Sequence, residues 1–200
     1  MTQTAAERGR QVRARLRAAA VELIVERGWA AVSTRLVADR AGVAPGLVHY
    51  HYASVRALLI EAATGTMTDL AGELDALLTG AVSPEAGVRA LLAALDGYSG
   101  TDPTSLLFVE AYLAAARDAE LRQVLTGILD GLRGRIADWL AGHGVADPPG
   151  SAAVLAAALD GLMLHRPLSS DLASDAVAGP LIRLVATDTT DTTDTTDTTA

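Results

Sequence analysis

The sequence predicts an all-α fold, and three observations support that prediction. Alanine and leucine, which favour helices, are abundant, whereas only seven of the 200 residues are aromatic. Apolar residues recur at helical spacing, and no segment shows the alternating pattern of a half-buried strand. Capping residues and first-turn prolines, which mark helix starts, precede several of these segments. Half of the residues are hydrophobic, which is enough for one good core or for a small module docked on a larger one.

The first three helices are expected in the N-terminal quarter of the chain. The first covers residues 7–27, where apolar side chains recur on one face. Ser33 is a suitable N-cap for the second, and Gly42 supplies a turn position that tolerates a positive φ. The third covers 45–51 and begins with a proline, whose missing N–H would have no helical partner there. Two short helices around a Gly-Val turn form the shape that places a second helix in the major groove of DNA.

A long fourth helix is expected to begin near Ser54 and to link this segment to the rest of the chain. Its apolar stripe comprises Leu59, Met67, Leu70, Leu74 and Leu77. Further helices are expected at 84–98, 103–117, 119–142, 151–165 and 174–186. Gly179-Pro180 could instead confine the last of these to Pro180 onward. The tail, 187–200, is mainly Asp-Thr-Thr repeats and is expected to be disordered because it has no large apolar side chain to bury.

Charge is distributed unevenly along the chain, whose formal net charge is −8. Residues 1–60 hold nine arginines and four acidic residues, 61–187 hold seven arginines and sixteen acidic residues, and the tail adds four aspartates. A basic N-terminal segment suits contact with phosphates, while an acidic remainder limits nonspecific binding to nucleic acid. The absence of cysteine excludes disulfides and thiolate metal sites. The longest apolar run, 152–159, is far short of the roughly 20 residues that span a membrane, so a cytoplasmic chain is expected.

The segments on either side of the predicted turn carry a resemblance to a known family. The segment before it reads Arg15-Leu-Arg-Ala-Ala-Ala-Val-Glu-Leu-Ile-Val-Glu-Arg-Gly28-Trp29, and the segment after it reads His49-Tyr-His-Tyr-Ala-Ser-Val-Arg-Ala-Leu-Leu. Over about fifty residues, from Val12 to Ala62, the chain resembles the TetR family of transcriptional regulators. Beyond them it is similar in helical layout and in the weak signatures Ala116-Arg-Asp-Ala-Glu-Leu-Arg and Ala158-Leu-Asp-Gly-Leu.

This resemblance implies a homodimeric regulator with two functional parts. Residues 1–53 would form a three-helix helix-turn-helix DNA-binding domain, and 54–186 a helical domain that binds an effector and dimerises. It further implies a repressor that binds a palindromic operator in double-stranded DNA and is released by a small-molecule effector. The identity of the effector and of the operator does not follow from the resemblance.

The resemblance also assigns a set of DNA contacts. Arg35, near the start of the second helix, is expected to read a guanine through two hydrogen bonds, with a phosphate contact or a solvated side chain as the alternative. Aromatic and histidine positions of the third helix are expected to bind phosphates, whereas Tyr52 is expected in the core. The complete set of expected DNA-binding residues is Ser33, Thr34, Arg35, Pro45, Gly46, Leu47, His49, Tyr50, His51 and Arg56.

Two residues depart from the family pattern. Ala44 stands where a serine or threonine usually caps the recognition helix, and losing that cap costs about 1 kcal/mol. Val55 stands where a lysine commonly adds a phosphate contact. Arg56 could supply the missing charge, although its direction on the helix differs by about 100°.

Large or polar-tipped side chains on the Ala/Leu-rich later helices are candidates for an effector pocket, with ordinary core filling as the alternative for each. Tyr112 and His165 are the strongest candidates, because their polar ends need partners if they are buried. With few cations in this region, an apolar or weakly polar ligand is expected rather than a highly anionic one. The candidates are Met67, Tyr98, Phe108, Tyr112, Trp139, Met163 and His165.

The last two predicted helices carry apolar faces that are candidates for a dimer interface. The family typically dimerises here as a four-helix bundle, and the two-fold symmetry of such a dimer matches a palindromic DNA site. The alternative is that these faces only cover the core of the single chain. The candidates are Leu155, Leu159, Leu162, Leu181, Leu184 and Val185.

Two other functions remain open at this stage. One is a ligand-independent or architectural DNA-binding protein. The other is a helical binding module or an enzyme with a vestigial DNA-binding head, which Ala44 and Val55 make more credible. Enzymatic activity is not expected, because the four histidines lack metal-ligand spacing and Gly97-Tyr-Ser99-Gly100 is one residue short of a nucleophile elbow. We therefore expect no cofactor, no metal and no membrane partner.

Overall fold

The structure is a computed structural model in which residues 4–169 and 172–187 are described. Within these residues the regular structure is entirely helical, which confirms the predicted fold class. The tail predicted to be disordered lies, from residue 188 on, outside the described residues. The α-helices are α1 Ala5–Arg27, α2 Thr34–Ala41, α3 Pro45–His51, α4 Val55–Thr79, α5 Pro84–Leu95, α6 Pro103–Ala115, α7 Ala119–Gly142, α8 Pro148–His165 and α9 Ser174–Leu184, with 3-10 turns at Trp29–Ala31 and Arg166–Leu168.

Helix ends follow the capping residues more closely than the apolar patterns do. Helix α1 begins two residues before the predicted start, because Thr4 and Glu7 form a capping box in which each side chain accepts a hydrogen bond from the other's backbone N–H. Helix α8 begins three residues early, because the Asp147 side chain accepts a hydrogen bond from the N–H of Gly150. Helix α9 is continuous through Pro180, so the alternative in which the last helix begins only at Pro180 is wrong.

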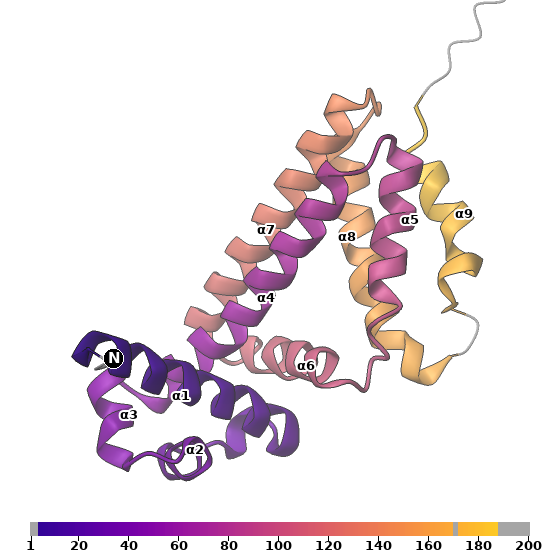
Figure 1. The fold of residues 1–200 in the computed structure, drawn as a ribbon. Helices are drawn as coiled ribbons and strands as arrows, with labels where there is room; N and C mark the ends of the chain where they lie inside the picture. The colour runs from indigo at the N-terminus through magenta and orange to yellow at the C-terminus, as the bar shows by residue number, and fades with distance from the viewer. Residues whose placement is uncertain (1–3, 170–171, 188–200) are drawn as a thin grey trace, which may run out of the picture.

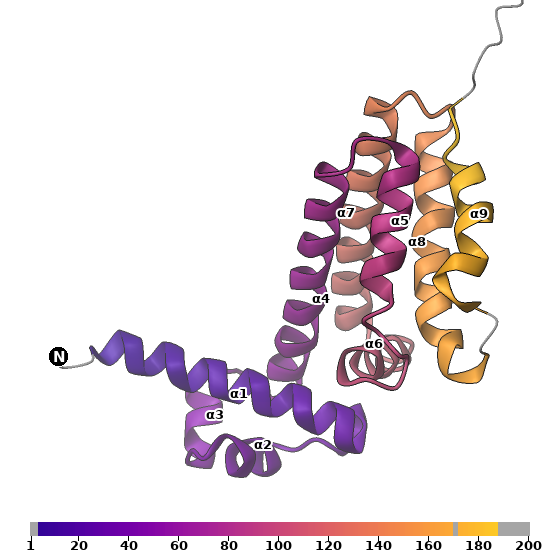
Figure 2. The same cartoon turned by 45° about the vertical axis from the view of Figure 1, so that its right-hand side comes forward.

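The helices form two units joined by α4 (Figure 1). We call α1–α3 the head and α4–α9 the body. In the body, α4 and α7 lie side by side along most of their length, with α5, α8 and α9 beyond them. Helix α6 crosses below these helices next to the head, and α1 runs across the direction of α4 (Figure 2). None of the helices in the described part of the chain is long and apolar enough to cross a membrane.

Two hydrophobic cores are built around α4. The head core buries Leu16, Leu23, Ile24, Val37, Val48, Leu58 and Met67 together with Leu107 of α6 and Leu121 of α7. The body core buries Leu78, Val88, Leu91, Ile136, Leu140, Leu155 and Leu181 from α4, α5, α7, α8 and α9. Helix α4 therefore contributes side chains to both cores, and the head core extends into the body through α6 and α7.

The apolar stripe of α4 differs from the predicted one at its end. Leu77, expected on the stripe, is 38% exposed, whereas Leu78 is buried in the body core. Met67, Ala71 and Leu78 follow one another at helical spacing and are buried, with Leu74 half-buried between them. The prediction was wrong by one position, because two adjacent leucines at 77 and 78 fit the apolar pattern almost equally well.

Close packing between α5 and α7 leads to a testable prediction at Gly87. A Cβ atom added to this glycine would lie 2.3 Å from the ring carbon Cη2 of Trp139. Gly87→Ala should therefore lower the free energy of unfolding by about 1–3 kcal/mol, because the indole must move out of a packed site. Urea unfolding of the two proteins at equal concentration measures the difference.

Gly127 of α7 provides the matched control. It is an exposed helical glycine, and a Cβ atom added to it would meet nothing within 4 Å. Gly127→Ala should raise the free energy of unfolding by about 0.5–1 kcal/mol through helix propensity alone. If Gly87→Ala stabilises the protein as Gly127→Ala does, the described contact between α5 and Trp139 is incorrect.

Candidate nucleic-acid interface and ligand cavity

The head has the geometry of a helix-turn-helix. Gly42 ends α2 in the left-handed conformation, with φ +64°, as the sequence predicted. The N–H of Val43 then donates to the carbonyl oxygen of Ala38 at 3.0 Å, which closes the turn. Val37 and Val48 are fully buried and fix the inner faces of α2 and α3 against α1 and α4. This packing leaves the outer face of α3 exposed to solvent.

The outer face of α3 carries most of the expected DNA-binding residues. Tyr50 is 80% exposed, whereas Tyr52 is 5% exposed and lies in the head core, as predicted. The ring of His51 is half-buried and meets the Tyr50 ring edge-on, with 5.0 Å between the ring centroids. The other exposed residues on this surface are Pro45, Gly46, Leu47 and His49.

The N-terminal end of α2 carries the expected DNA contacts that precede the turn. The hydroxyl of Ser33 accepts a hydrogen bond from the N–H of Leu36 at 3.4 Å and caps α2. Thr34 is half-buried, and the side chain of Arg35 is 88% exposed. The only ion pair of Arg35 in the described residues is a long one, 3.8 Å from Nε to a carboxylate oxygen of Asp39. As the sequence indicated, Ala44 gives α3 no side-chain cap.

Arg56, expected as a DNA contact, is engaged by two acidic side chains at the N-terminal end of α7. Its Nε and Nη2 atoms each donate to a carboxylate oxygen of Asp118 at 2.6 Å, and Nη1 pairs with Glu120. Asp118 also caps α7 by accepting a hydrogen bond from the N–H of Leu121 at 3.0 Å. Arg56 therefore ties the first turn of α4 to the first turn of α7. The sequence could not indicate this pairing, because the two segments lie more than sixty positions apart.

Other ion pairs hold the head together. On α2, Arg40 binds Glu22 and Glu26 of α1 at 2.9 and 2.6 Å. Tyr52 donates from its hydroxyl to Glu61 of α4 at 3.1 Å. Arg13 of α1 pairs with the same carboxylate and lies over the Tyr52 ring, 4.9 Å from its centroid. A further contact fixes α6, whose Glu110 accepts a hydrogen bond from the backbone N–H of Trp29 at 2.8 Å.

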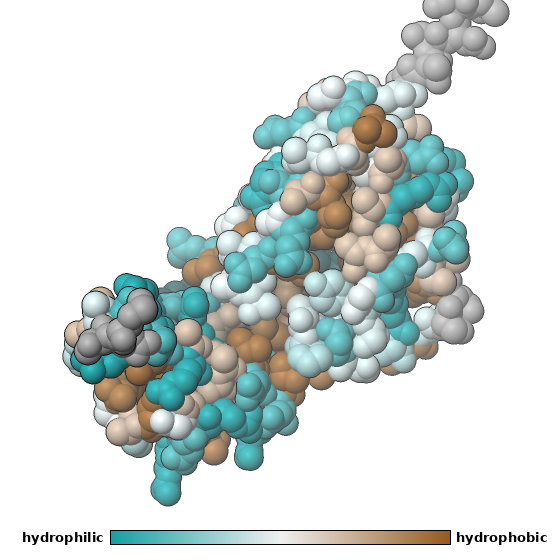
Figure 3. All heavy atoms as spheres, viewed as in Figure 1, coloured by the Kyte–Doolittle hydropathy of each residue, from teal (hydrophilic) through white to brown (hydrophobic). Residues whose placement is uncertain are grey.

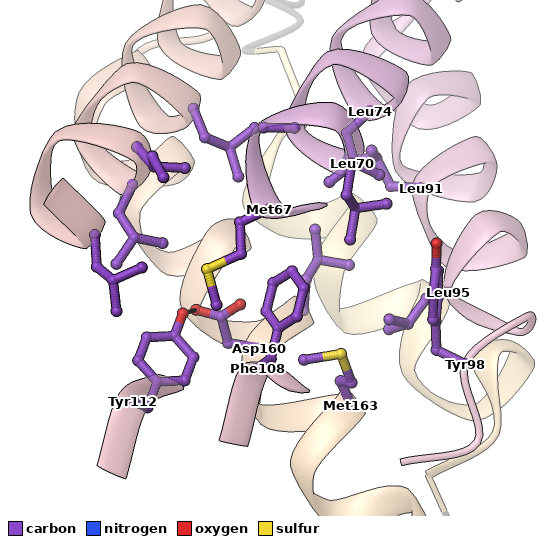
Figure 4. Close-up of a pocket in the computed structure, with 16 residues that line it drawn as sticks. Met67, Leu70, Leu74, Leu91, Leu95, Tyr98, Phe108, Tyr112, Asp160 and Met163 are labelled. Atoms are coloured by element: carbon purple, nitrogen blue, oxygen red, sulfur yellow. Dashed lines mark hydrogen bonds between the residues drawn. The ribbon is translucent and has the colours of Figure 1, made fainter. Parts of the chain in front are cut away.

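A largely apolar cavity of about 80 Å³ lies inside the body (Figure 4). Helices α4, α5, α6, α7 and α8 all contribute to its wall. Five of the seven predicted pocket residues line it: Met67, Tyr98, Phe108, Tyr112 and Met163. The remaining wall consists of Leu70, Ala71, Leu74, Leu91, Leu95, Leu125, Ile128, Leu129, Leu132, Leu159 and Asp160. Figure 3 shows apolar side chains reaching the surface between α4 and α5 and hydrophilic side chains along the outer rim of the head.

Two predicted pocket residues lie elsewhere. Trp139 packs against Gly87 and the ring of His143, whose centroid is 4.7 Å from that of the indole. His165 is exposed near the end of α8. Residues two apart on a helix point in directions about 200° apart, so the placement of Met163 on the cavity wall turns His165 away from it.

Asp160 is the residue that sequence reasoning missed. Its Oδ2 atom accepts a hydrogen bond of 3.2 Å from the Tyr112 hydroxyl, and both side chains face the cavity. Burial raises the pKa of Asp160 above its usual value, while the hydrogen bond from Tyr112 and the charge of Arg133 oppose that shift. Burial and the nearby carboxylate also raise the pKa of Tyr112. The signal in the sequence was a single acidic residue in the otherwise apolar segment 151–164.

The residues predicted at a dimer interface pack against the body core of the single chain. Leu155, Leu159, Leu162, Leu181 and Val185 are at least nine-tenths buried, and Leu184 packs against the same body core. Both faces of α8 are apolar, and the inward one carries Leu155, Leu159 and Leu162. The outward face carries a second stripe at helical spacing, continued by the following 3-10 turn, with Val154 53%, Leu164 50% and Leu168 83% exposed.

Two family models match the chain. The model described as "Bacterial regulatory proteins, tetR family" matches residues 16–62. The model described as "Tetracyclin repressor-like, C-terminal domain" matches residues 82–189, which is more than half of the chain. The first match covers the helix-turn-helix and the start of α4, and the second begins just before α5.

Individual proteins are similar over most of their length. The chain is 30% identical over 154 residues to the HTH-type transcriptional regulator BetI of Rhizobium meliloti (strain 1021), and the match covers 76% of each protein. The structure of SCO7518 from Streptomyces coelicolor A3(2) matches with a TM-score of 0.75 at 30% identity, covering 88% of this chain and 99% of that one. The multidrug binding protein EbrR, complexed with malachite green, matches with a TM-score of 0.64 at 25% identity, covering 87% and 98%.

The ion pair of Arg56 leads to a prediction about pH. The guanidinium of Arg56 and the capped N–H of Leu121 lower the pKa of Asp118 to about 2 in the folded chain. An unfolded aspartate has a pKa of about 3.9, so this pair stabilises the fold above that pH, and the stabilisation is lost as the pH falls through about 2. Asp118→Asn keeps a capping side chain but removes the charge. The variant should be less stable than the original protein at pH 7, and the difference should shrink between pH 4 and pH 2.

Urea unfolding at a series of pH values measures that difference. Asp147→Asn is the control, because Asp147 caps α8 in the same way without an ion pair in the described part of the chain. Its stability difference should stay small over the whole range. A difference for Asp118→Asn that is independent of pH would mean that the ion pair with Arg56 does not stabilise the fold.

Proposed function

The chain belongs to the TetR family of transcriptional regulators, and on this premise we propose that it is a repressor that binds a palindromic operator as a homodimer and is released by a small effector. Residues 1–53 serve as the DNA-binding domain in this proposal, and 54–186 as the effector-binding and dimerisation domain. The observation that carries the proposal is an apolar cavity whose wall includes α4, the helix that continues directly from the exposed helix-turn-helix. Its place of action is the cytoplasm, together with the DNA that it binds.

DNA binding is proposed for the outer face of α3 and the start of α2. Tyr50 and His49 are exposed there and provide polar groups that can bind phosphates. The exposed Pro45, Gly46 and Leu47 have no polar side chain and can contact base edges, such as thymine methyl groups, at close range. Arg35 is long and largely solvent-exposed, so its guanidinium is available to read a guanine. Arg56 has no part in this contact, because its guanidinium is engaged by Asp118.

A second copy of the chain is proposed to cover the outward stripe of α8. Val154, Leu164 and Leu168 are large apolar side chains with at least half of their surface exposed, and Ala157 and Gly161 between them allow a partner helix to approach closely. A homodimer with two-fold symmetry presents two recognition helices to two half-sites. The family membership supports a second copy as the partner.

Effector control is proposed to act through α4. Met67, Leu70, Ala71 and Leu74 of this helix line the cavity, and its first turn is attached to the head core and to Asp118. A ligand that favours a different position of α4 would change the spacing of the two heads and lower operator affinity. The similarity to EbrR supports a small-molecule ligand, since that protein was solved with malachite green.

The proposed role of Arg35 predicts a loss of sequence preference on mutation. Arg35→Ala should lower specific DNA affinity by about 1–3 kcal/mol and relax the preference at one base pair in each half-site. Arg40→Ala is the matched control, because Arg40 lies on the same helix but is held by Glu22 and Glu26. It should leave DNA preference unchanged. The measurement is binding to operator sequences selected from genomic DNA and to their single-base variants.

Two results of that experiment would count against parts of the proposal. Equal weakening of Arg35→Ala on every sequence would make Arg35 a phosphate contact only. If the original protein selects no DNA sequence at low salt, the repressor function itself is wrong.

The proposed dimer face predicts a change of oligomeric state. Leu164→Glu should raise the dimer dissociation constant by about tenfold or more, since it buries a charge in an apolar interface. Leu113→Glu on α6 is the control, because Leu113 is similarly exposed, at 56%, but lies on another helix. Sedimentation equilibrium measures both. A dimer that is unaffected by Leu164→Glu would place the interface elsewhere.

A further inference from the structure

We propose that the effector is a small, mainly apolar molecule with a single positive charge, bound in the cavity with that charge beside Asp160. This inference rests on the proposed function in taking the cavity to be the effector site. It adds the chemical class of the ligand, which follows from the charges and side chains of the cavity wall.

The cavity wall carries one charged side chain. Asp160 lies among leucine, methionine and aromatic side chains, and the other polar atoms of the lining side chains are the hydroxyls of Tyr98 and Tyr112. Its hydrogen bond comes from the Tyr112 hydroxyl, a donor that carries no charge. Among the described residues, Asp160 forms no ion pair, so its charge is not neutralised by a contacting cation. Asp160 is half-buried in this apolar wall, and a positively charged ligand would provide the missing partner, because removing a charge from water is costly unless the charge is paired.

Arg133 is the cation that most affects Asp160, and its position argues against an anionic ligand. Its charge acts on both Asp160 and Tyr112, but its side chain is not part of the cavity wall. Its Nη1 atom is 3.5 Å from a carboxylate oxygen of Asp130, on its own helix. A ligand in the cavity therefore meets a carboxylate directly, whereas an anion would find no lining cation with which to pair.

The side chains around Asp160 suit the apolar part of such a ligand. In Figure 4 the Met67 and Phe108 side chains and the Tyr112 ring lie close to the carboxylate, and Met163 lies next to Phe108. Aromatic faces attract cations, and thioether sulfurs are polarisable and adapt to irregular shapes. The cavity of about 80 Å³ is well below the roughly 300–1,000 Å³ of drug-sized sites, so the ligand is small or the helices separate to admit it.

The experiment compares three probes that differ mainly in charge. Phenyltrimethylammonium is a cation, tert-butylbenzene has the same shape without charge, and benzoate is a small aromatic anion. Isothermal titration of the full-length protein at pH 7.5 should give at least tenfold tighter binding for the cation than for tert-butylbenzene, and the weakest binding for benzoate. This comparison uses the unaltered chain and does not depend on the folding of any variant.

Asp160→Asn tests the assigned residue. The amide keeps the size of the carboxylate and can still accept the hydrogen bond from Tyr112, so the cavity should keep its shape. The variant should bind phenyltrimethylammonium at least tenfold more weakly and tert-butylbenzene within about twofold of the original protein. Asp138→Asn, on the exposed surface of α7 and outside the cavity wall, should change neither affinity.

The outcomes separate this inference from the proposed function. Equal or weaker binding of the cation relative to tert-butylbenzene, failure of all three probes to bind, or an Asp160→Asn variant with unchanged cation affinity would each overturn the inference. Operator binding with and without phenyltrimethylammonium is measured separately. Cation binding that depends on Asp160 but leaves operator affinity unchanged supports the inference and contradicts the proposed effector control.

Discussion

Helix α4 packs into the head core through residues 58–67 and into the body core through Leu78, about three turns further along. Its 25 residues extend over roughly 37 Å, so one rigid element connects the two cores without a break. Core packing resists gradual deformation, because a small displacement of a buried side chain either keeps or loses its close contacts. A displacement of α4 at the cavity would therefore shift the whole helix, including its contacts in the head core.

Polar contacts reinforce this connection where the head meets the body. Arg56 holds the start of α4 to Asp118 at the start of α7, and Glu110 of α6 holds the N–H of Trp29 just after α1. Both contacts join segments that are far apart in sequence, and both lie beside the apolar contacts made by Leu107 and Leu121. The orientation of the head thus depends on α6 and α7 as well as on α4.

Local sequence signals were sufficient to predict most of the architecture. The left-handed Gly42, the Ser33 cap and the inward Tyr52 each follow from nearest-neighbour patterns or from the family resemblance carried by the same segment. The side chains that were misplaced depend on contacts between distant segments. Nothing in the sequence near Arg56 indicates its acidic partner, Asp118, which lies at the start of α7. The apolar pattern of α8 does not specify which of its two faces is inward.

The cavity residues could likewise be predicted only in part from the sequence. Large side chains such as Phe108 and Met163 are recognisable as candidates in the sequence, whereas Asp160 is one of sixteen acidic residues in this part of the chain and is not marked as a cavity residue by its apolar segment alone. Its importance arises from burial among apolar neighbours contributed by four other helices. Burial of this kind becomes visible only when the helices are assembled.

The extension of the head core into α6 and α7 has a consequence for protein engineering. A chimera joined at residue 53 would transplant α1–α3 without Leu58, Leu107 and Leu121, which complete their core. The transplanted unit would meet foreign side chains at all three positions, and its apolar underside would be incompletely covered. Exchange of DNA specificity between relatives is therefore better achieved by replacing the exposed residues of α2 and α3 on this scaffold than by exchanging the whole unit.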